Sequence, residues 1–124
     1  MSAVLAYVAA GIVALWGVAH VLPTAKVVAG YSDTSRDNRL IITQEWIAEA
    51  MIMWLIAAIV VVATGLGGSQ PALVDWIYRI SAAALFAIAT LTAVTGARTA
   101  VIFFKVCPAL LSATAVLLLV ASWS

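Results

Sequence analysis

Four long apolar segments, separated by short polar or glycine-rich breaks, dominate the hydrophobic pattern of the chain. They cover approximately residues 3–22, 41–66, 72–97 and 100–122. Each is close to the roughly 20 residues that an α-helix needs to cross the hydrocarbon of a bilayer. The pattern therefore predicts an all-α fold, in which four transmembrane helices form an antiparallel up-down-up-down bundle. We expect a single transmembrane domain over residues 1–124.

The breaks between the segments have simple chemical causes. Pro23 and the polar run of residues 31–39 end the first segment, and a cluster of glycines with Pro71 turns the chain after the second. Arg98 and Thr99 mark a third connection that is very short. Segments three and four should therefore form a tight antiparallel hairpin.

Composition agrees with a lipid environment. The chain is 66% hydrophobic and only 9% charged, with a mean hydropathy of +1.19, whereas a soluble domain carries about 25% charged residues. The first segment has no Lys or Arg before its apolar run, and it is longer than the roughly 7–15 apolar residues of a secretory signal. We expect it to be a retained first helix.

The distribution of basic residues predicts an orientation. Positive charge favours the cytoplasmic side of a membrane, and the first and third connections carry nearly all of it. The loops 23–40 and 98–99 are therefore expected in the cytoplasm and both termini outside. On the opposite side, Arg79 follows Asp75 by one helical turn and should pair with it. The basic residues of the predicted cytoplasmic side are Lys26, Arg36, Arg39, Arg98 and Lys105.

The first connection is the only extended polar segment, and its positive and negative charges alternate. A solvated loop held by local ion pairs is the default interpretation, and Asp37 or Asn38 can cap the second helix. A partner-docking loop is the alternative. Its basic residues could also meet anionic lipid headgroups.

Tryptophans support the predicted depths. Four of them fall near segment ends, where indoles prefer the membrane interface: Trp16, Trp46, Trp76 and Trp123. Only Trp54 lies in the middle of a segment. We expect it to pack between helices.

Polar groups inside a membrane are costly, so they are the first candidates for a functional site. Glu45 and Glu49 share one face of the second segment, and His20 lies at the same membrane depth on the first. These and neighbouring residues predict a polar ligand pocket near the cytoplasmic leaflet. Its expected members are Trp16, His20, Glu45, Trp46, Glu49, Met53, Thr92, Thr95 and Lys105.

A structural interpretation of the same residues stays open. Glu45 could lie in the headgroup region, where the start of a helix favours an acid. Glu49 could form a structural pair with His20, Lys105 or Arg98. His20 could simply be an interfacial, hydrogen-bonded histidine.

Other kinds of site are disfavoured. A single cysteine, Cys107, excludes an intramolecular disulfide and a multi-cysteine metal site in one chain, and we expect it to be an apolar filler. A single histidine excludes bis-histidine haem ligation unless subunits share ligands. No metal and no cofactor is expected, and the net charge of +1 gives no reason to expect nucleic acid.

Several short motifs resemble the DoxX-like families of small four-helix membrane proteins. They are Gly17-Val-Ala-His20 followed by Pro23, a glutamate early in the second segment best matched by Glu49, Leu91-Thr-Ala-Val-Thr-Gly, and Pro108-Ala-Leu-Leu. The resemblance implies a four-helix fold and roles that range over respiratory or redox-complex partners, assembly factors and binders of lipid-like molecules. It implies no particular catalytic mechanism. Arg36, Arg39 and Glu45 also resemble the basic-then-acidic entry to the second helix of membrane glutathione-transferase-like enzymes, but their spacing does not match well and the asparagine expected between the basic residues and the glutamate is absent.

Three functions follow from these observations. The first is a non-catalytic accessory subunit or assembly factor that packs against a larger membrane protein, or against further copies of the chain. The second is a small membrane enzyme or binder for a lipid-like substrate (a quinone, isoprenoid or sterol-like molecule), with Glu49 and His20 as acid and base. The third is a transporter or channel subunit, which the lack of an acid in the first segment disfavours. Whether the protein is an enzyme is left open.

Overall fold

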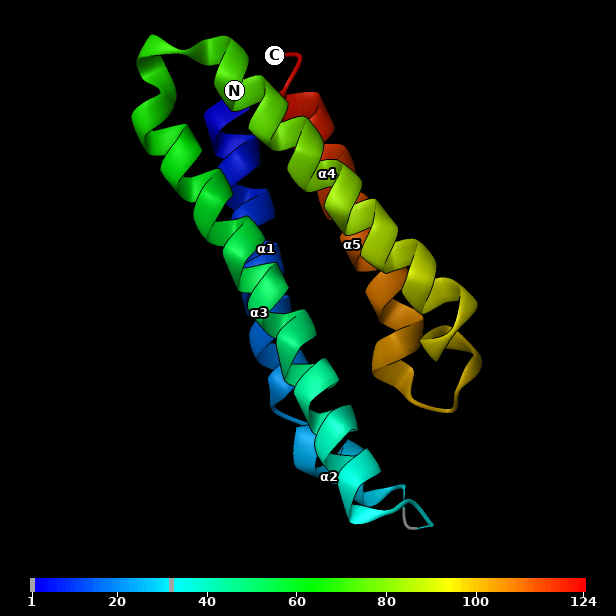
Figure 1. Ribbon diagram of the computed structural model, residues 1–124. Coiled ribbons are helices and arrows are strands. Elements are labelled where there is room, and N and C mark those ends of the chain that lie inside the picture. The colour runs from blue at the N-terminus through cyan, green and yellow to red at the C-terminus, as the bar shows by residue number, and fades with distance from the viewer. Residues whose placement is uncertain (1, 32) are drawn as a thin grey trace.

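A computed structural model describes residues 2–31 and 33–124, and every regular element in this part of the chain is a helix (Figure 1). Four helices are long and apolar enough to cross a membrane, as the hydrophobic pattern predicted. The predicted all-α bundle of four membrane-spanning helices is thereby confirmed. In chain order the elements are α1 (Ser2–Val21), α2 (Thr24–Ala29), α3 (Arg36–Leu66), η1 (Gly67–Ser69), α4 (Pro71–Val94), η2 (Gly96–Arg98) and α5 (Ile102–Ala121).

The four long helices form two antiparallel pairs. α1 packs along α3, and α4 packs along α5, while α1 and α5 join the two pairs. α3 and α4 make far fewer contacts with each other, and in Figure 1 they run apart from the turn at η1 towards the opposite end. The bundle is therefore tightly packed on three sides and loosely packed on the fourth.

Small side chains allow the close approach of α1 to its neighbours. Ala6, Ala9 and Ala10 are buried along one face of α1, as expected for helices that associate in lipid through close packing. The largest fully buried side chains fill the space between the helices, while many leucines, isoleucines and valines remain exposed on the outside. An apolar exterior of this kind is stable in a lipid bilayer.

α3 is longer than its apolar segment. It begins at Arg36, whereas the hydrophobic pattern placed its start at 41. Its 31 residues correspond to about 46 Å of helix at about 1.5 Å per residue, against about 30 Å of hydrocarbon. The first turns of α3 therefore extend beyond the bilayer core, next to the short helix α2, which the sequence did not predict.

The cap of α3 differs from the prediction. Ser35 is the N-cap residue, and its Oγ accepts a hydrogen bond from the backbone N–H of Asn38 at 3.2 Å. The prediction of Asp37 or Asn38 was wrong because both lie inside the first turn, where a side chain cannot reach the free amides ahead of it in the way an N-cap can. Asp37 still places a negative charge at the positive end of the helix.

The expected Asp75–Arg79 pair is also absent. Within the described residues the one salt bridge joins His20 and Glu49. Arg79 instead donates hydrogen bonds from Nε to Ser122 Oγ at 3.2 Å and from Nη2 to the Ser122 carbonyl at 3.3 Å. The end of α5 offers a carbonyl and a hydroxyl together, and carbonyls at a helix C-terminus attract a cation.

Candidate functional site

His20 and Glu49 form the centre of the candidate site. The last turn of α1 carries His20 and α3 carries Glu49, and the distance from His20 Nε2 to Glu49 Oε2 is 3.5 Å. His20 is only 5% exposed, and its Nε2 makes no hydrogen bond in the described structure. The side chain of Glu49 is 28% exposed. The imidazole is thus buried behind a carboxyl that remains accessible.

Trp46 holds His20 in place. The indole stacks on the imidazole with the ring centres 4.4 Å apart and the planes inclined by 18°. Its Nε1–H donates a hydrogen bond of 2.6 Å to the His20 carbonyl, one of the last carbonyls of α1. The edge of the same indole meets Phe104 of α5 at 5.0 Å. Trp46 therefore fixes the position of the imidazole relative to three helices.

Trp16 has a different role from the one predicted for it. Its Nε1–H points to Sγ of Cys107 at 3.3 Å, and its ring packs against Phe103 at 6.4 Å. Thr92 of α4 also lies beside the buried thiol. Trp16 thus connects α1 to α5, and Cys107 accepts a weak hydrogen bond as well as filling space.

Glu45 and Glu49 line the same groove, which lies on the loosely packed side of the bundle. It lies between α3 and α4 and has a volume of about 460 Å³. Glu45, Trp46 and Glu49 contribute the polar groups, all from α3, whereas the α4 wall is apolar. The lining residues are Ile41, Ile42, Glu45, Trp46, Ala48, Glu49, Ile52, Ile88 and Leu91.

Six of the nine predicted pocket residues do not line this groove. His20 lies directly behind Glu49 and Trp16 packs against Cys107, as described above. Met53 is fully buried in the core, and Thr92 is buried with its hydroxyl bonded to the Ile88 carbonyl. The Thr95 hydroxyl is bonded to the Leu91 carbonyl, and Lys105 is exposed. Of the predicted set, Glu45, Trp46 and Glu49 line the groove.

Apolar residues of the groove were missed by the sequence analysis. Ile88 and Leu91 form its α4 wall, yet nothing distinguishes them from the other apolar residues of a chain that is 66% hydrophobic. Phe104, which contacts Trp46, was missed for the same reason. Only the polar members gave a recognisable signal.

The arrangement has a defined chemical capacity. Glu49 can accept a hydrogen bond or a proton from a group in the groove, because its side chain is part of the lining. His20 does not line the groove but lies within ion-pair distance of Glu49. A cation or proton donor behind the carboxyl offsets part of the cost of placing it in a membrane.

Comparison of the chain with protein-family models, curated proteins and solved structures finds no match. The likeness to the DoxX-like families therefore rests on the short motifs alone. What the structure establishes is the coarser statement, a small membrane protein with four membrane-spanning helices.

Proposed function

We propose that the protein binds a lipid-like molecule with a hydrogen-bonding head in the groove between α3 and α4. The observation that carries this proposal is the accessible carboxyl of Glu49 in an otherwise mostly apolar groove, with the buried His20 at 3.5 Å behind it. An ionisable group at this depth is expensive, which favours a functional role.

The shape and chemistry of the groove support this class of ligand. A volume of about 460 Å³ falls within the roughly 300–1,000 Å³ typical of small-molecule sites. Glu45 and Glu49 lie one helical turn apart on the polar wall, and the remaining lining is largely aliphatic. An apolar molecule could enter from the lipid through the loosely packed side and place a hydroxyl head, such as that of a hydroquinone, prenol or sterol, against the carboxyls.

Catalysis is the more demanding version of the same proposal. Glu49 would act as the acid or base on the head group, since it is the member of the pair that lines the groove. His20 would then be a positioning residue that holds the carboxyl and exchanges charge with it. Binding alone requires that the Glu49 carboxylate accept a charge-assisted hydrogen bond from the head group, which is roughly twice as strong as the bond that the neutral amide oxygen of a glutamine could accept.

The test is to identify apolar molecules retained by the protein after extraction in mild detergent, using native mass spectrometry and analysis of the released compounds. We expect the wild type to retain a neutral lipid-like molecule and Glu49→Gln to lose most of it. Asp37→Asn is the matched control, because it removes a carboxylate from the same helix outside the groove. Equal retention by Glu49→Gln and the control would contradict the proposal, as would no retention by either the wild type or the control.

An accessory-subunit role is the second candidate. The exposed start of α3, with Arg36, Asp37 and Arg39, extends past the bilayer core and offers a charged surface to a partner. The same experiment separates the two candidates. A larger membrane protein that co-purifies with the wild type and with Glu49→Gln alike would favour the subunit role over the groove.

A further inference from the structure

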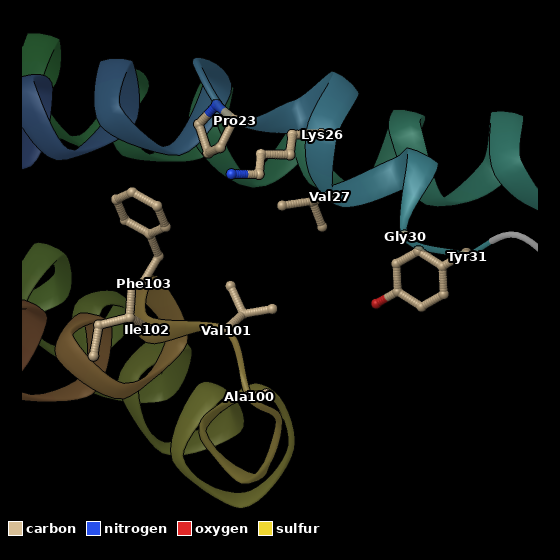
Figure 2. Close-up of a pocket in the computed structure, with 9 residues that line it drawn as sticks. All are labelled: Pro23, Lys26, Val27, Gly30, Tyr31, Ala100, Val101, Ile102 and Phe103. Atoms are coloured by element: carbon tan, nitrogen blue, oxygen red, sulfur yellow. The ribbon is translucent and has the colours of Figure 1, made fainter.

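We propose that a second cavity, separate from the groove, binds an anionic phospholipid with its phosphate on Lys26. The cavity lies between α2 and the connection that leads into α5 (Figure 2). It shares no lining residue with the α3–α4 groove, so this proposal does not depend on the function proposed above.

The walls of the cavity combine one cationic group with apolar surface. Its volume is about 460 Å³. Figure 2 shows the amine of Lys26 and the hydroxyl of Tyr31 pointing into the space that faces Val101 and Phe103. The lining residues are Pro23, Lys26, Val27, Gly30, Tyr31, Ala100, Val101, Ile102 and Phe103.

The charges favour an anion. None of the lining residues is acidic, and Lys26 forms no salt bridge with any residue that the structure describes. This is also the end of the bundle, here called the basic end, that carries Lys26, Arg36, Arg39, Arg98 and Lys105. A positive amine in a cavity without a counter-charge is complementary to a phosphate, which Tyr31 can support by donating a hydrogen bond.

The depth of the cavity favours a lipid over a free phosphate. α1 ends at Val21 after about 30 Å of helix, which matches the hydrocarbon thickness. Lys26, on the helix that follows, therefore lies at the level of the headgroups. Ile102 and Phe103 begin α5 and lead from there into the hydrocarbon, so an acyl chain can continue where the phosphate ends. Basic residues at this level attract anionic lipids.

The experiment measures lipid binding to the delipidated full-length protein by native mass spectrometry. Phosphatidylglycerol is titrated in parallel with phosphatidylcholine and with inorganic phosphate. We expect the wild type to bind phosphatidylglycerol in preference to both. Lys26→Gln should weaken this binding about fivefold, the value of one basic contact near a charged surface. Arg39→Gln, which removes a charge from the same end outside the cavity, should change it little.

A second variant tests the apolar part of the site. Val101→Trp keeps the charge of Lys26 but fills the cavity that Val101 lines, so it should also reduce phosphatidylglycerol binding. Equal losses in Lys26→Gln and Arg39→Gln would overturn the proposal by showing a general electrostatic effect. The proposal would also be overturned if phosphatidylcholine or inorganic phosphate bound as tightly as phosphatidylglycerol. Binding of phosphatidylglycerol to Val101→Trp at the wild-type level would overturn it as well.

Discussion

At the scale of single residues, indole N–H groups connect the helices. Trp54 lies over Gly17 of α1 and donates a hydrogen bond of 3.1 Å to the Ala14 carbonyl. This mid-segment tryptophan therefore contacts a second helix as expected, but it lies across the outside of α1 and α3, is 39% exposed and is not enclosed between helices. The contact requires a glycine, because a Cβ at residue 17 would lie 2.5 Å from the indole nitrogen.

Gly17→Ala should therefore destabilise the bundle. The methyl group displaces the indole and breaks the hydrogen bond to Ala14, which together correspond to about 1–3 kcal/mol. Unfolding in detergent, followed by helical circular dichroism, measures the loss. Gly11→Ala is the matched control, since a Cβ there meets nothing within 4 Å. Equal stability of the two variants would show that the contact with Trp54 is unimportant.

The sequence predicts how deep in the membrane the residues of the candidate site lie, but not which way their side chains point. Hydropathy places His20 and Glu49 at the same level of the membrane, so their proximity could be inferred. The rotation of each helix about its axis depends on packing across the bundle. For this reason Lys105 was expected in the pocket but is exposed, and the stacking of Trp46 on His20 could not be predicted.

At the scale of elements, the start of α3 illustrates the difference between an apolar segment and a helix. Hydropathy indicates where the chain enters hydrocarbon, whereas capping determines where the helix begins. α4 (Pro71–Val94) and α5 (Ile102–Ala121) lie close to their predicted ranges. At Pro71 and at the polar residues near 98, the apolar segment and the helix are interrupted at the same place. α2 was missed because its six residues are too short to show a period.

Ser35→Ala should loosen the first turn of α3. Loss of the N-cap hydrogen bond to Asn38 costs about 1 kcal/mol, so exchange of the amides of Asn38 and Arg39, which are bonded to Ser35, should accelerate about fivefold. Exchange elsewhere in α3 should change little. Ser69→Ala, at a serine of η1 with no side-chain cap, is the control. Unchanged exchange in the first turn would contradict a capping role for Ser35.

At the scale of the whole molecule, the basic end predicts an orientation that can be measured. The first and third connections should face the cytoplasm because they carry most of the Lys and Arg residues. η1 and both termini lie together at the opposite end (Figure 1). They should therefore face the outside.

Single added cysteines test this orientation. A membrane-impermeant maleimide should label Gln70→Cys in intact cells and label Asp33→Cys only after the membrane is opened; both positions are exposed in the structure. Cys107 is buried and serves as an internal control that should not react. Labelling of Asp33→Cys in intact cells would reverse the predicted topology.

The pairing of the long helices has a consequence for how the protein assembles. α1 with α3, and α4 with α5, are each neighbours in sequence among the long helices, so each pair can form soon after both members enter the membrane. We therefore expect the two hairpins to associate last, along the line where α1 meets α5. That line carries the contact of Trp16 with Cys107. The angle at which the two hairpins associate there sets the spacing of α3 and α4 on the far side.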